Sequence, residues 1–121
     1  MKTHLTTNRL GLASLSPLNI QTLEEFTKAV SALLQNRLKT VILYGSQARG
    51  DALSDSDIDI LLVIDSSENI NLDWDQCINI AAEIASQTGV LISVMLCHAK
   101  DYAEREHPLL MNIRREGIMV A

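Results

Sequence analysis

Residue types that mark several protein classes are scarce in this chain of 121 residues. It contains five glycines and two prolines, too few to suggest a disordered segment. No run approaches the roughly 18 consecutive apolar residues of a membrane-spanning helix, so we expect no membrane insertion. Polar residues interrupt the apolar ones of residues 1–17, which argues against a secretory signal. The length predicts a single domain, and the lack of a secretory signal predicts that it is cytoplasmic.

Cysteine and basic residues are also scarce. Because there is no secretory context, we expect Cys77 and Cys97 to be free thiols packed as small apolar groups. The net charge is −5, which argues against direct nucleic-acid binding, since that affinity comes from clustered lysine and arginine. The acidic residues concentrate between Asp51 and Asp75, where no lysine or arginine intervenes. Such a segment is either solvated or binds cations.

The apolar periodicity divides the chain into a lead-in, residues 1–21, and a domain, residues 22–121. A capping box at Thr22 predicts a helix to about Arg37, and Asn71 is expected to cap a second helix that ends at Gly89. Strands are predicted at 40–44, 57–64 and 90–97, and helical segments near 101–106 and after Pro108 up to Gly117.

These elements predict an α+β fold, a small mixed β-sheet flanked by helices. The turn that follows Tyr44 is too short for a crossover helix, so strands 40–44 and 57–64 are expected to pair in antiparallel fashion. In the second of these strands, Asp57 and Asp59 share one face with Leu61 and Val63, while the isoleucines and Leu62 point to the other face.

The segment from Gly45 to Leu62 is the most informative part of the chain. Its aspartates resemble a calcium loop, but Ile60 stands where that loop needs glycine and Ser66 stands where it needs glutamate. The glycine-rich P-loop and dinucleotide fingerprints are absent as well, because Gly45 and Gly50 are followed by Ser46 and Asp51. A nucleotide bound here would be held in another way.

The remaining pattern suits phosphoryl or nucleotidyl transfer. Asp57 and Asp59, two positions apart on one strand, point to the same side and can ligate a divalent metal. Gly45 lets the backbone approach a phosphate closely, while Ser46 can donate its hydroxyl and begin a helix whose N–H groups face the anion. Arg49 can add charge-assisted hydrogen bonds to phosphate, or it can pair with Asp51 or Asp55.

Gly45-Ser46, ten residues, and then Asp57-Ile58-Asp59 resembles the G-S-x10-D-x-D signature of the DNA polymerase beta-like nucleotidyltransferases. The size of the chain and its tail from Pro108 to Gly117 resemble the minimal nucleotidyltransferases. The resemblance implies Mg²⁺, ATP as substrate and transfer of a nucleotidyl group. It also implies a partner, a small helical HEPN protein. Some minimal nucleotidyltransferases act as antitoxins that adenylylate or sequester such a partner.

One departure concerns the third carboxylate that catalytic members of that family carry on a neighbouring strand. Strand 90–97 contains no acidic residue; Ser93 is expected in that place, and Asp101 or Glu83 could substitute only if the fold brings them near. Three hypotheses remain. The chain is an active transferase that modifies a partner protein, a weakened binding module that neutralises the partner by contact, or a transferase acting on a small molecule.

The last hypothesis is disfavoured because so short a chain leaves no second domain to hold a small substrate. The apolar tail residues Leu109, Leu110 and Ile113 would suit either a homo-oligomer or burial against the partner.

Overall fold

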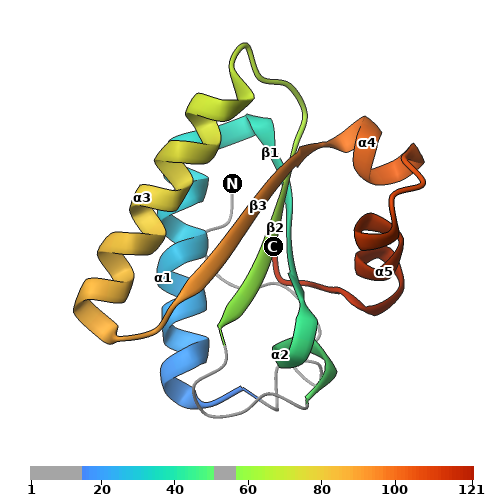
Figure 1. Cartoon of the computed structure of the whole chain (residues 1–121). Coiled ribbons are helices and arrows are strands. Elements are labelled where there is room, and N and C mark those ends of the chain that lie inside the picture. Colours follow the sequence, from blue (N-terminus) through green and yellow to red (C-terminus); the bar gives the residue numbers. More distant parts are fainter. Residues whose placement is uncertain (1–14, 51–56) are drawn as a thin grey trace.

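The computed structural model describes residues 15–50 and 57–121 (Figure 1). The elements follow in the order α1 (Pro17–Leu34), η1 (Gln35–Arg37), β1 (Leu38–Tyr44), α2 (Gly45–Arg49), β2 (Ile58–Ile64), α3 (Ile70–Thr88), β3 (Ile92–His98), α4 (Ala99–Glu104), α5 (Pro108–Glu116) and β4 (Ile118–Met119). The predicted strands and the two C-terminal helical segments agree with these bounds to within two residues at each end. The expected α+β class is confirmed.

The first helix begins earlier than the capping box at Thr22 predicts. It starts at Pro17, and the hydroxyl of Ser16 accepts a hydrogen bond from the Asn19 N–H at 3.1 Å. A proline in the first turn loses no helical hydrogen bond, and the preceding serine satisfies a free N–H group, so Ser16-Pro17 is the stronger start signal. The helical part of the domain thus includes residues assigned to the lead-in.

The four strands form one mixed sheet in the order β3-β2-β1-β4. β1 pairs antiparallel with both β2 and β4, whereas β2 and β3 run parallel. The parallel pair is joined by α3, as a crossover requires, and the antiparallel pairing of β1 with β2 is confirmed.

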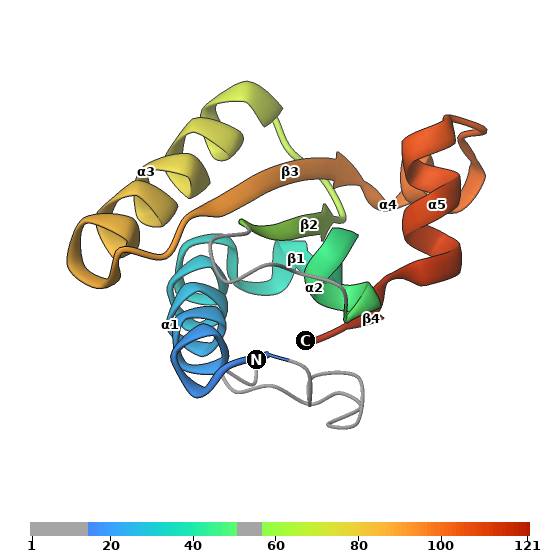
Figure 2. The same cartoon turned by 60° about the horizontal axis from the view of Figure 1, so that its bottom comes forward.

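Helices cover the two faces of the sheet unequally (Figure 2). α1 and α3 pack on the face that carries Ile58, Ile60, Leu62 and Ile64 and form the larger apolar cluster. The opposite face carries Leu61 and Val63 and packs against α4 and α5. The predicted division of β2 into two faces is therefore confirmed. Leu110 and Ile113 are buried in this smaller cluster, so these two tail residues are covered within the chain itself.

The second long helix begins earlier than predicted, and its buried residues include an acidic one. Asn69 caps α3, because its side chain accepts a hydrogen bond from the Leu72 N–H at 3.1 Å, and Asn71 lies inside the helix. Ile78 is 44% exposed although it is apolar. Asp73, an acidic residue, is buried instead.

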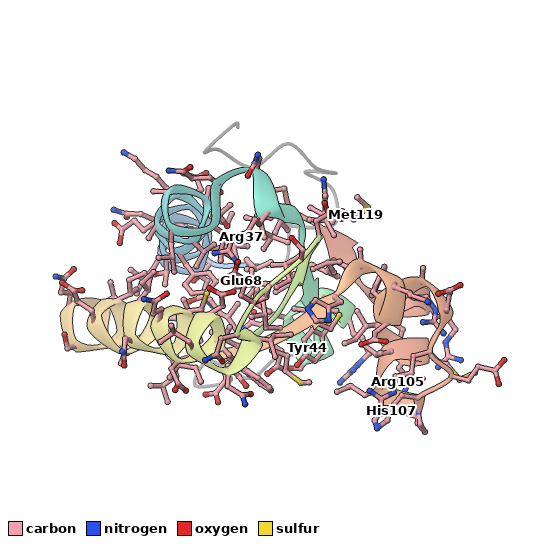
Figure 3. All side chains as sticks on the ribbon, turned by 90° about the horizontal axis from the view of Figure 1, so that it is seen from above. Arg37, Tyr44, Glu68, Arg105, His107 and Met119 are labelled. Atoms are coloured by element: carbon pink, nitrogen blue, oxygen red, sulfur yellow. The ribbon has the colours of Figure 1, made fainter. Side chains whose placement is uncertain are left out.

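Asp73 is buried because it pairs with Arg37, which lies 36 positions earlier in the chain. The two guanidinium nitrogens of Arg37 lie 2.7 and 3.2 Å from the two carboxylate oxygens, and the Ser67 hydroxyl donates a third hydrogen bond at 2.5 Å. Arg37 and Glu68 are labelled next to each other in Figure 3. Together with Asp73 they line a hollow of about 570 Å³. The pair ties the start of β1 to the first turn of α3.

Two threonines of α1 are equally buried but differ in hydrogen bonding. The Thr22 hydroxyl donates to the Leu18 carbonyl at 2.8 Å, whereas the Thr27 hydroxyl has no partner among residues 15–50 and 57–121. A buried hydroxyl without a partner costs free energy, since it loses its hydrogen bonds to water.

Thr27→Val is therefore expected to raise the free energy of unfolding by about 1 kcal/mol, measured by urea denaturation. Thr22→Val is the matched control, the same change in the same helix, and should lower that free energy by about 0.5–1 kcal/mol. Equal effects of the two substitutions would contradict the assignment of Thr27 as the unsatisfied group.

Both cysteines are free, as expected, with Cys77 buried and Cys97 half-buried. Burial raises the pKa of each thiol to about 11, so neither is a reactive thiolate near neutral pH. None of the helices in the described ranges is both long enough and apolar enough to cross a membrane.

Candidate active site

The two aspartates of the D-x-D sequence lie at the start of β2. Asp57 is exposed and immediately precedes the strand, whereas Asp59 is half-buried within it. Asp59 lies opposite Tyr44 of β1 and opposite Ser93 of β3. Its side chain therefore lies on the α5 side of the sheet, between these two neighbours.

The surroundings of the Asp59 carboxyl group disfavour its negatively charged form. Burial raises its pKa, the neighbouring charge of Asp57 raises it further, and Arg49 lowers it. A divalent cation would supply the missing charge, and carboxylate oxygens are the ligands that Mg²⁺ prefers. The acid pair therefore fits a magnesium ion in its donor chemistry.

Gly45 brings the backbone against the Asp59 carboxylate. Its φ is +74°, a conformation that side chains disfavour, and a Cβ at this position would lie 3.2 Å from the Asp59 carboxyl carbon and in direct collision with one oxygen. The glycine of the Gly-Ser sequence and the second aspartate of the D-x-D sequence thus form one contact.

Gly45→Ala is expected to lower the free energy of unfolding by more than Gly89→Ala, which serves as its matched control. Gly89 has a φ of +76° but nothing within 4 Å of an added Cβ, so alanine there meets backbone strain alone, about 1–2 kcal/mol. The excess at Gly45 should disappear in an Asp59→Ala background. Equal losses at the two glycines in urea denaturation would refute the contact.

Ser46 and Arg49 lie at the two ends of α2. Ser46 is in the first turn of this helix, as the sequence predicts, and Gly50 ends it in the left-handed conformation. The Arg49 guanidinium lies 3.6 Å from the Glu116 carboxylate of α5. The alternative partners of Arg49 expected from sequence, Asp51 and Asp55, lie outside the described residues.

A hollow of about 180 Å³ opens beside this motif, between α2 and α5. Its walls come from the end of β1, from α2 and from α5: Tyr44, Gly45, Arg49, Leu109, Asn112, Ile113 and Glu116. Sequence reasoning included Gly45 and Arg49 but missed Tyr44, Asn112 and Glu116. Asn112 and Glu116 lie in the tail that resembles the minimal nucleotidyltransferases, but that resemblance gave neither residue a role, and nothing in the sequence marked Tyr44. The packing of α5 on the sheet brings the three residues together.

The place expected for a third acid is occupied by Ser93, which faces Asp59 in register. Asp101 follows the opposite end of β3, and Glu83 belongs to α3, which covers the other face of the sheet. Neither substitutes for the missing acid. Within the described ranges no three His, Cys, Asp or Glu side chains gather as a metal site. Two carboxylates suffice for Mg²⁺ when substrate phosphates and water complete its shell.

An acid pair beside a Gly-Ser turn, on one face of a mixed sheet, is the arrangement of the nucleotidyltransferase class. Residues 28–121 match the family described as polymerase beta, nucleotidyltransferase, and the chain belongs to this family. The prediction of a minimal nucleotidyltransferase is confirmed.

Two relatives come from Methanocaldococcus jannaschii, and both are assigned by name to the protein adenylyltransferases. One is 36% identical over 74 residues, which are 61% of this chain and 68% of the relative. The other is 34% identical over 77 residues, 64% of this chain and 77% of the relative.

Two solved structures share the fold. One is a protein of Sulfolobus solfataricus assigned as a nucleotidyltransferase, with a TM-score of 0.52, 21% identity and coverage of 82% of this chain and 76% of that one. The other is a chain of a toxin–antitoxin structure with AMP-PNP, with a TM-score of 0.56, 16% identity and coverage of 86% and 72%. The predicted nucleotidyltransferase fold is confirmed.

Proposed function

We propose that this nucleotidyltransferase transfers AMP from ATP to a partner protein, in a Mg²⁺-dependent reaction, as the antitoxin of a toxin–antitoxin pair. The observation that carries the proposal is the contact between Gly45 and Asp59, which brings the predicted phosphate-binding turn against the acid pair. The names of the two relatives support the acceptor class. The toxin–antitoxin role is supported by the solved chain of the same fold that belongs to a toxin–antitoxin structure with AMP-PNP.

In this proposal Ser46 and Arg49 bind the phosphates of ATP, and Asp57 and Asp59 would hold Mg²⁺. When bound, the ion supplies positive charge that lowers the pKa of the attacking hydroxyl and stabilises the leaving oxygen. The acceptor hydroxyl forms a bond to the α-phosphorus, the bond from that phosphorus to the bridging oxygen breaks, and pyrophosphate leaves. The hydroxyl proton passes to solvent.

The partner we propose is a HEPN protein, and the cytoplasm, which supplies ATP and Mg²⁺, is the proposed compartment. A protein acceptor is favoured over a small molecule because the two relatives are assigned by name to the protein adenylyltransferases. A homo-oligomer remains a proposal of its own, to be tested by the mass of the protein in solution with and without the partner.

The experiment that tests the function is incubation of the purified protein with Mg²⁺, the proposed HEPN partner protein, and ATP labelled at the α-phosphate. We expect the label on the partner protein and none when ATP carries the label at the γ-phosphate, since pyrophosphate leaves. Transfer of the γ-label, or no label while the partner remains active, would overturn the proposal.

A second candidate function rests on one observation, the place of Ser93 opposite Asp59. Serine is not a base near neutral pH, and general-base catalysis is worth about 10²–10⁴-fold in rate. A chain without that base can bind the nucleotide and the partner and neutralise the partner by contact. No label on a partner that is bound and inhibited would favour this function.

Ser93→Asp distinguishes the two functions. If transfer is limited by the missing base, the variant should transfer AMP faster, by up to about 10²-fold at saturating Mg²⁺. Ser86→Asp, an exposed serine of α3, is the matched control and should leave the rate unchanged. A rate unchanged or lowered in Ser93→Asp would mean that a base at this position does not limit the reaction.

A further inference from the structure

α2 and α5 lie next to each other (Figure 2), and the hollow between them is lined by apolar and by charged side chains. Tyr44, Leu109 and Ile113 belong to the apolar cluster on this face of the sheet. Arg49 and Glu116 give the same hollow a charged rim, where their side chains are 46% and 37% exposed. Apolar walls with a few polar groups at the rim are characteristic of small-molecule sites.

The size of the hollow limits what it can hold. Its volume of about 180 Å³ lies below the roughly 300 Å³ from which pockets for drug-sized ligands begin. It therefore has room for a part of a nucleotide and not for all of it. Because Gly45 forms part of its wall, that part would be joined to a phosphate group lying at the Gly-Ser turn.

We propose that this hollow binds the nucleoside half of the nucleoside triphosphate and that Glu116 accepts hydrogen bonds from its ribose hydroxyls. The proposal rests on the proposed function, which places the phosphates at Ser46 and Arg49. It extends that function to α5, an element outside the Gly-Ser and D-x-D sequences. The apolar walls contact the faces of the sugar and base, and the Glu116 carboxylate accepts hydrogen bonds from the ribose hydroxyls.

The ion pair between Glu116 and Arg49 predicts that one substitution changes the affinities for two kinds of ligand in opposite directions. A carboxylate 3.6 Å from Arg49 competes with phosphate for the guanidinium. Removing Glu116 therefore leaves Arg49 more available to a polyphosphate that lacks a sugar. The same change removes an acceptor from the ribose, so the two kinds of ligand should respond in opposite directions.

The experiment measures binding by isothermal titration calorimetry in Mg²⁺ with three probes: a non-hydrolysable ATP analogue, its 2′,3′-dideoxy counterpart and inorganic tripolyphosphate. Glu116→Ala should weaken the ATP analogue by about 10-fold or more, the effect of losing a charge-assisted hydrogen bond. The affinity for the dideoxy analogue should change by less than about 2-fold. The affinity for tripolyphosphate should stay the same or rise. Glu116→Gln, which keeps a neutral acceptor, should show an intermediate loss.

Glu83→Ala is the matched control, since it removes the same charge from an exposed position of α3 on the other face of the sheet. It should leave all three probes unchanged. The proposal is overturned if Glu116→Ala binds the ATP analogue like the unmodified protein, or if it weakens all three probes equally. Failure of the unmodified protein to bind even tripolyphosphate would instead refute the proposed phosphate site at Ser46 and Arg49.

Discussion

Replacing Asp57 and Asp59 together by asparagine should lower the rate of AMP transfer by at least about 10²-fold, because the variant loses both carboxylates proposed to hold Mg²⁺. The measurement is transfer of α-labelled phosphate from ATP to the partner protein. Asparagine keeps the size of each side chain, so the contact between position 59 and Gly45 is retained. The loss is then one of charge and not of packing.

Loss of the Asp59 charge should not destabilise the folded protein in the absence of Mg²⁺. The pKa of Asp59 is raised by burial and by Asp57, so its charged form is disfavoured in the folded state. Folded-state stability is therefore lost as the pH rises from 3.8, the ordinary pKa of an aspartate, through the raised pKa of Asp59. Asp59→Asn removes this dependence, and its thermal midpoint at neutral pH without Mg²⁺ should equal or exceed that of the unmodified protein.

Mg²⁺ provides a second readout that does not require the partner. A ligand that binds only the folded state raises the thermal midpoint, so Mg²⁺ with ATP should stabilise the unmodified protein and not the double variant. Asp65→Asn, an exposed acid at the other end of β2, is the control and should behave like the unmodified protein. Full transfer by the double variant would refute the metal-binding role of the acid pair.

Asp73→Ala should lower the free energy of unfolding by about 2–3 kcal/mol. The carboxylate accepts two hydrogen bonds from Arg37 and one from Ser67, and its side chain is only 11% exposed. Breaking a buried ion pair costs about 3–5 kcal/mol, and the loss here is smaller because the Arg37 side chain is 35% exposed. Urea denaturation measures the difference.

The pair should also make stability depend on acid pH. The hydrogen bonds from Arg37, and then that from Ser67, lower the pKa of Asp73 below 3.8, the ordinary value of an aspartate, although burial opposes them. The stabilisation is thus fully present above the pKa of the unfolded chain and is lost as the pH falls through the lower folded pKa. Asp73→Ala should lack this part of the acid sensitivity.

Asp75→Ala is the control for Asp73, since it removes an exposed acid from the same helix and should change the free energy of unfolding by less than about 0.5 kcal/mol. Adding Arg37→Met to Asp73→Ala should recover part of the loss, because the unpaired guanidinium is then gone. Similar losses at Asp73 and Asp75, or no recovery in the double variant, would show that the pair does not stabilise the fold.

The amino-acid sequence alone predicted the features that lie within one element or one short segment of the chain. A period of two residues divided β2 between its two faces and placed Asp57 and Asp59 together, and the Gly-Ser and D-x-D sequences identified the family. Helix starts were predicted less well: Ser16 and Asn69 cap α1 and α3, whereas the sequence predicted Thr22 and Asn71, whose side chains can also cap a helix. Several residues near a helix start can cap it, and tertiary packing chooses among them.

Only the tertiary structure decided which distant residues meet. The register of the parallel strands brings Ser93 opposite Asp59, and the packing of α5 brings Glu116 to Arg49 and completes the hollow beside the motif. The burial of Asp73 follows in the same way from Arg37, 36 positions away. Local periodicity shows which face of an element is apolar, but the contacts between elements depend on strand order, register and helix placement, which no single segment specifies.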